Sequence, residues 1–220
     1  MAKKILLGLA AGLLVVAGVA GMAAYEAHII NVTAHIENAL YVHPDKIAFG
    51  TVFPQEYIER DFTVELSTSF QEQTRLDDVE YVIKQKPKCI NEKGEYAPVD
   101  YATERCPEDY KPMLSLCPYL SKNDADPIDG NDKSHPSYYH DPDGKPGSGD
   151  EYCDATPAPD ATGVLFRESD PIDLWKVDLK VPPVEGYVGQ DWPAGCPVVE
   201  ENDKDYGCDL WIEVTKFSGF

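Results

Sequence analysis

The residues best suited to ligand chemistry are aspartates gathered in one stretch that is rich in glycine and asparagine. Loops of this kind supply the hard oxygen ligands that calcium prefers. The spacing differs from that of an EF-hand, because Ile128 stands at position five after Asp124 and no glutamate stands at twelve. Asp and Gly also build ordinary turns, so a solvated loop is the alternative. The predicted calcium ligands are Asp124, Asp126, Asp129, Asp132, Asp141 and Asp143.

Motifs that would indicate catalysis are missing from the sequence. It contains no H-E-x-x-H, G-x-S-x-G, S-x-x-K or phosphate-binding glycine loop. A carboxylate pair can hydrolyse glycosides, but among 39 acidic residues some pair will lie close in space regardless of function. We therefore expect that the protein is not an enzyme. The net charge of −20 argues against nucleic-acid and anionic-membrane binding, since no basic surplus neutralises phosphates.

Six cysteines form the second chemical signal: Cys89, Cys106, Cys117, Cys153, Cys196 and Cys208. An even number in an exported chain predicts three disulfides, and the absence of a C-x-x-C pair argues against zinc and redox sites. Fifteen pairings are possible. We expect Cys196 to pair with Cys208, which would close the short loop before the last strand. The other four cysteines would then bridge the loop-rich middle of the chain, in a pairing that the sequence leaves open.

The N-terminus has the organisation of an export signal. Lys3 and Lys4 precede an apolar run over residues 5–19, and small residues follow up to residue 24. We expect residues 1–24 to be removed by cleavage after Ala23 or Ala24. The alternative is a retained anchor, since about 20 apolar residues span a bilayer. Either way we expect a secreted or cell-surface protein that meets the membrane only through this leader.

Alternation of apolar and polar residues predicts an all-β fold. Between residues 40 and 67 we expect two short strands, the second around Ile47 and Phe49, and a longer one with Phe62, Val64 and Leu66 on its buried face. Further strands are expected over residues 77–86, 163–166, 174–181 and 210–217, with a helical turn possible in 68–76. Together they predict one antiparallel jelly-roll or immunoglobulin-like sandwich over residues 25–220.

The stretch 87–163 has a different character, because it is dense in Pro, Gly, Asp, Tyr and Cys. We expect a long loop insertion ordered by disulfides or ions. Aromatic side chains in and near it either stack on sugars or cover the ends of the sheets. These are Tyr138, Tyr139, Tyr152, Trp175 and Trp192.

A further strand is predicted directly after the leader, over residues 25–37. Its apolar face carries Ile30, Val32, Ala34 and Ile36. Such a terminal strand can pair within its own sheet, or it can leave and complete the sheet of a neighbour. Both arrangements require the same alternation.

Two motifs resemble the TasA/camelysin-like group of exported β-sandwich proteins, found in bacterial biofilm matrix and archaeal bundling pili. They are I-x-F-G-x-V-x-P-x-E at residues 47–56 and W-x-V-x-L-x-V-P at residues 175–182. The resemblance implies a jelly-roll subunit that polymerises by donor-strand exchange, with residues 25–37 as the donor. The six cysteines and the acidic insertion depart from that group, and Gln55 replaces the turn glycine.

These observations predict a structural subunit of an extracellular filament or surface matrix, which forms a homopolymer by N-terminal donor-strand complementation. The alternative is a monomeric cell-surface module that binds calcium, a glycan or a protein partner.

Overall fold

A computed structural model describes residues 35–125, 134–137, 160–183 and 203–219. The chain divides into two compact units, Met1–Ile36 and Glu37–Phe220, and the second contains every strand described below. No helix among the described residues is long and apolar enough to cross a membrane.

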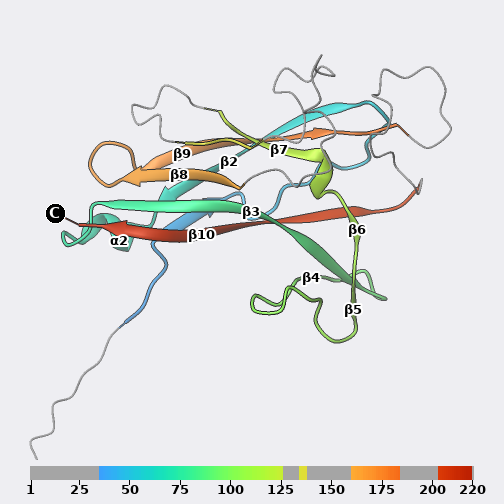
Figure 1. Ribbon diagram of the computed structural model, residues 1–220, viewed down its shortest axis with the longest axis horizontal. Helices are drawn as coiled ribbons and strands as arrows, with labels where there is room; N and C mark the ends of the chain where they lie inside the picture. Colours follow the sequence, from blue (N-terminus) through green and yellow to red (C-terminus); the bar gives the residue numbers. More distant parts are fainter. Residues whose placement is uncertain (1–34, 126–133, 138–159, 184–202, 220) are drawn as a thin grey trace, which may run out of the picture. The chain divides into compact units, whose positions relative to one another are not determined.

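The first sheet has four antiparallel strands and forms the upper layer in Figure 1. Its order is β1 (Leu40–His43), β2 (Tyr57–Leu66), β9 (Ile172–Lys180) and β7 (Leu120–Asp124). The predicted alternation in β2 is confirmed, since Phe62, Val64 and Leu66 are buried. Only β2 residues 63–66 pair with β1, so the first half of β2 extends beyond that partner.

The second sheet is built around the long strand β3 (Asp78–Asn91). Antiparallel partners of β3 are β8 (Ala161–Phe166), β10 (Tyr206–Ser218), β4 (Tyr96–Pro98) and β5 (Tyr110–Pro112). A short strand, β6 (Leu114–Ser115), pairs in parallel with Tyr206 and Gly207 of β10. Ahead of β3, the expected helical turn is α2 (Thr68–Glu72), whose first turn is capped by Ser67.

The two sheets face each other over one apolar core, which confirms the all-β sandwich-like fold. Both layers contribute to this core: Phe62, Val64, Leu66, Phe70, Val79, Tyr81, Ile83, Leu120, Ala161, Leu165, Trp175, Val177, Leu179 and Val181. Tyr81 and Trp175 meet edge to face, with ring centroids 6.4 Å apart. The Trp175 indole N–H donates to the Tyr81 hydroxyl at 2.6 Å, which satisfies a polar group in the core.

Two expected elements differ from those observed. The second short strand, around Ile47 and Phe49, does not form, because residues 44–56 make no ladder with any described strand. Within the expected insertion, the polar segment Leu120–Asp124 is strand β7, which pairs with β9 along its whole length. Part of the stretch predicted as loop therefore belongs to the sandwich itself.

Disulfide pairing also corrects the prediction. Cys208 is bonded to Cys117, not to Cys196, and Cys89 is bonded to Cys106. Cys117 opens the short 3-10 helix η1 (Cys117–Tyr119), which precedes β7, so this bridge connects segments 91 residues apart. Cys153 and Cys196 lie outside the described residues.

Candidate functional site

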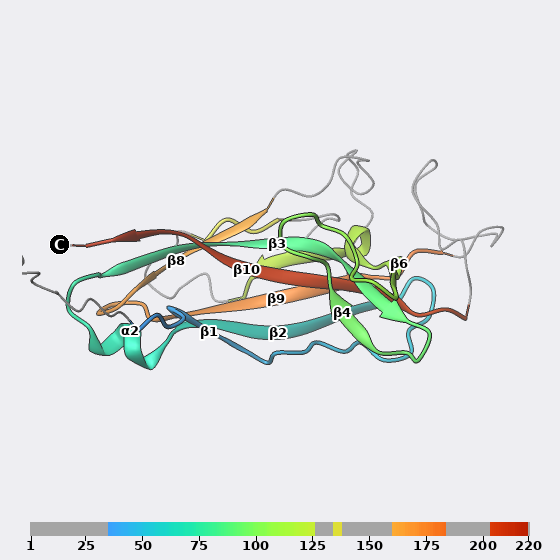
Figure 2. The same cartoon turned by 90° about the horizontal axis from the view of Figure 1, so that it is seen from below.

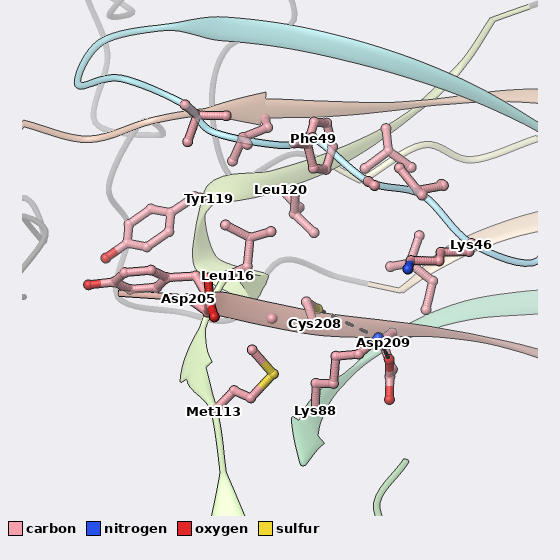
Figure 3. A pocket seen from close by; sticks show the side chains of 18 of the residues that line it. Lys46, Phe49, Lys88, Met113, Leu116, Tyr119, Leu120, Asp205, Cys208 and Asp209 are labelled. Carbon is pink, nitrogen blue, oxygen red and sulfur yellow. Dashed lines mark hydrogen bonds and ion pairs between the residues drawn. The ribbon is translucent and has the colours of Figure 1, made fainter. Parts of the chain in front are cut away.

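An apolar groove with a volume of about 1170 Å³ lies beside β10. One wall is formed by residues 42–54, from the end of β1 to the turn before β2. The opposite wall is the first half of β10, and the floor comes from β2, β9 and β7. Figure 3 shows Leu116, Tyr119 and Leu120 beside β10 at this site. Apolar side chains on its walls include Val42, Ile47, Phe49, Val52, Leu210 and Ile212.

The groove exists because β10 has one paired edge and one open edge. β3 pairs along one side of β10, whereas in the described part of the chain only β6 pairs on the other side, at Tyr206 and Gly207. In Figure 2, β9 lies next below β10, and β2 and the blue segment after β1 follow further below. Among the described residues, no strand pairs with this side of β10 beyond Gly207.

The segment 44–54 is held as a wall by its turn. The backbone N–H of Gln55 donates to the carbonyl of Val181 at 2.8 Å, and the N–H of Val181 donates to the carbonyl of Glu56 at 2.9 Å. Gly50 and Gln55 have φ values of 76° and 67°, in the left-handed region that favours glycine. Gln55, which replaces the turn glycine of the motif at residues 47–56, therefore has a backbone conformation that favours glycine.

Charged side chains also line the groove. Lys88 forms an ion pair with Asp209 at 2.9 Å, and Figure 3 shows Lys46 to the right of Leu120 and Asp205 beside Leu116. An apolar trough bordered by an open strand edge and a polar rim is suited to an extended peptide segment. Main-chain groups of β10 offer hydrogen bonds, and the trough offers space for alternate apolar side chains.

Most of the predicted donor strand precedes the described residues. Ile30, Val32 and Ala34 lie outside them, as do the predicted cleavage residues Ala23 and Ala24. Ile36 is described, and its side chain is 90% exposed although its place in the alternation predicts an inward orientation.

The predicted calcium ligands are not brought together in the described structure. Asp124 lies at the end of β7, where its carboxylate accepts a hydrogen bond from the Ser134 hydroxyl. The other five, Asp126, Asp129, Asp132, Asp141 and Asp143, lie outside the described residues. Among the residues that the structure describes, no cluster of three or more His, Cys, Asp or Glu side chains could hold a metal ion.

Of the five aromatic residues predicted to stack on sugars or cover the sheet ends, the structure describes one. Trp175 is wholly buried in the core and offers no face to a ligand, and Tyr138, Tyr139, Tyr152 and Trp192 lie outside the described residues. An unpredicted pair is present instead on the outer face of the second sheet. Tyr101, which is 71% exposed, stacks on Trp211 with ring centroids 5.5 Å apart.

A buried polar cluster lies on the outer face of the first sheet. Asp178 is fully buried and lies in register between Glu59 of β2 and Ser121 of β7. Ser121 donates to Asp178 at 3.1 Å, and the Asn123 side-chain amide also donates to it. Burial raises the pKa of Asp178 to about 6, and the hydrogen bond from Ser121 opposes this rise. Lys176 forms an ion pair with the neighbouring Glu59 at 3.2 Å.

Sequence reasoning did not find the groove, since its lining comes from segments far apart in the chain. The alternation in β10 predicts a buried face but says nothing about which edge is paired. No family model, no curated protein and no solved structure matches the chain. The resemblance to the TasA/camelysin-like group therefore stays a prediction.

Proposed function

We propose that the protein is a structural subunit of an extracellular filament or cell-surface matrix. In this proposal the N-terminal strand of one subunit enters the groove beside β10 of the next. The observation that carries the proposal is the open edge of β10 above an apolar trough. An open apolar edge is a liability in a monomer, and a strand from another chain removes it.

The spacing of the apolar residues in the predicted donor matches that in β10. β10 is 13 residues long, and its described pairing leaves one edge open after Gly207. Its partly buried residues Cys208, Leu210, Ile212 and Val214 pack against the core at every second position. Ile30, Val32, Ala34 and Ile36 repeat the same spacing, about 7 Å between alternate residues of a strand. A donated strand would thus set four apolar side chains alongside four on β10.

Ile36 is the one apolar residue of the predicted donor strand that the structure describes, and its side chain is 90% exposed. Insertion into a neighbour would bury it. The contact is head to tail and does not close on itself, so each added subunit presents a fresh groove and the assembly grows into a fibre. The two disulfides are typical of proteins that mature in an oxidising compartment, which agrees with assembly outside the cell.

Deletion of residues 25–37 tests this function. If the strand is donated, the shortened chain stays folded and soluble but forms no polymer in sedimentation or light scattering. If it is self-paired, the deletion unfolds the sandwich, which would contradict the proposal. A matched pair of point variants separates the two faces of the strand: Ile36→Asp should block polymerisation, whereas His35→Asp should not.

A second candidate is the monomeric binding module, which one observation favours. The stacked pair Tyr101 and Trp211 presents an exposed aromatic surface suited to a sugar ring or a partner side chain. A monodisperse monomer at every concentration and calcium level would favour this function over the filament.

A further inference from the structure

The disulfide between Cys117 and Cys208 borders the groove. Cys208 lines it on the wall formed by β10, and Cys117 opens η1, close in sequence to the lining residues Leu116, Tyr119 and Leu120. In Figure 3, Leu116 and Leu120 lie on one side of Cys208 and Met113 on the other. Because η1 leads into β7 of the first sheet, the bridge ties the two layers together where the groove passes between them.

Few other described bonds hold the start of β10 against η1. β6 pairs with only Tyr206 and Gly207, and the Leu116 N–H donates to the Gly207 carbonyl at 3.0 Å. The Gln85 side chain donates to the carbonyls of Cys117 and Leu120 at 3.2 and 3.4 Å. Side chains of β10 also pack against the core at Cys208, Leu210, Ile212 and Val214. Among the described contacts, the bridge is the covalent link between the β10 wall and the segment that leads into β7.

We propose that forming the Cys117–Cys208 bridge converts the groove into its strand-accepting state, so that subunit assembly depends on oxidation. This inference rests on the proposed function, because it concerns the same groove. The two thiols give up two protons and two electrons, and a disulfide of a thiol-exchange oxidant takes them up to become a dithiol. The reaction passes through a mixed disulfide between one of the two cysteines and the oxidant.

Such a dependence would separate synthesis from polymerisation. In a reducing compartment the walls lack their covalent link, and the apolar strand of one chain finds no ordered groove in another. After export, oxidation orders the groove, and assembly begins where the filament is needed. Neither cysteine of the other described bridge, Cys89–Cys106, lines the groove, so this bridge provides a matched control.

The test measures binding of a fluorescent peptide with the sequence of residues 25–37. The acceptor is the full chain carrying Ile30→Asp and Val32→Asp, so that it cannot donate its own strand. Three versions are compared: all cysteines present and oxidised, Cys117→Ser with Cys208→Ser, and Cys89→Ser with Cys106→Ser. Without the bridge, we expect fewer than about a tenth of the molecules to be in the strand-accepting state. The affinity for the peptide should then fall roughly tenfold or more, in the second version only.

The possible results separate the two proposals. Equal binding by all three versions would overturn the redox dependence and leave the proposed function intact. Failure of the fully oxidised acceptor to bind would count against the proposed function itself. Hydrogen exchange of the β2–β9 ladder shows whether the sandwich stays folded. Weaker binding with intact protection supports the inference, whereas weaker binding with lost protection means that the bridge acts through global stability, which overturns it.

Discussion

Gly163 of β8 lies opposite Tyr81 of β3 in the β-ladder, with its backbone directly against the phenol ring. A Cβ atom at this position would stand nearer than 3.0 Å to the ring, a separation that Cβ atoms essentially never show. The ring cannot move aside easily, because its hydroxyl donates to Asp173 and accepts from Trp175. This contact fixes how closely β8 approaches the core.

Replacing Gly163 with alanine should therefore destabilise the fold. Overpacking of this kind costs about 1–3 kcal/mol, measured as the free energy of unfolding in denaturant. The same substitution in a Tyr81→Leu background supplies the control, because the ring that causes the clash is then absent. An equal cost in both backgrounds would contradict the proposed clash.

The raised pKa of Asp178 predicts that the stability of the fold depends on pH. Its pKa is about 6 in the folded chain and about 4 when unfolded, so the folded chain binds this proton more tightly. The stabilisation is fully present below about pH 4 and is lost as the pH rises to about 6. Asp178→Asn removes the ionisable group and should raise stability at pH 7 by about 2 kcal/mol relative to the native chain, with little gain at pH 4.

Denaturant titrations at the two pH values measure this difference. Asp61→Asn is the control, since Asp61 is an exposed carboxylate of β2 in register with Lys176. A gain from Asp178→Asn that is equal at pH 4 and pH 7 would show that the carboxylate does not carry the effect.

Gly50 allows a clean test of the turn that forms one groove wall. Its φ is 76°, and a Cβ there would meet nothing within 4 Å, so any cost of substitution comes from the backbone alone. Gly50→Ala should lower the free energy of unfolding by about 1–2 kcal/mol. Gly50→Asn should cost clearly less, because asparagine tolerates the left-handed region. Equal costs would contradict this account of the turn.

Ile212 tests the groove independently of the donor strand. Its side chain lines the groove and is half-buried, whereas Thr215 further along β10 is exposed. Ile212→Arg should place a charge in the acceptor site and abolish polymerisation, because burying an unpaired charge is costly. Thr215→Arg should assemble normally. Polymerisation is followed by light scattering, and assembly of both variants would indicate that subunits do not join through this groove.

The regular strands were accessible from the sequence, because they carry alternating apolar residues. Phe62, Val64 and Leu66 of β2 are buried as predicted, and the strand expected over residues 77–86 forms as part of β3, where Val79, Tyr81 and Ile83 are buried. The strand β7 could not be predicted from the sequence, because LSKND has a single apolar residue. Its place in the sheet depends on backbone pairing with β9. Cys117 and Cys208 are 91 residues apart, and only the folded topology brings them together.

The candidate site was less predictable than the fold. The alternation of residues 30–36 indicated a strand without saying where it binds, and Ile36 alone of its four apolar residues is described. The acceptor groove depends on which edge of β10 is paired, a property of the topology that no local pattern records.

The most direct measurement is electron microscopy of the oxidised protein, purified without residues 1–24 and concentrated with and without calcium. The account predicts regular filaments whose maps show residues 25–37 of one subunit as a strand along the open edge of β10 in the next. The side chains of Ile30, Val32, Ala34 and Ile36 should point into the apolar groove. A monodisperse monomer under every condition, or filaments in which that groove is empty, would contradict it.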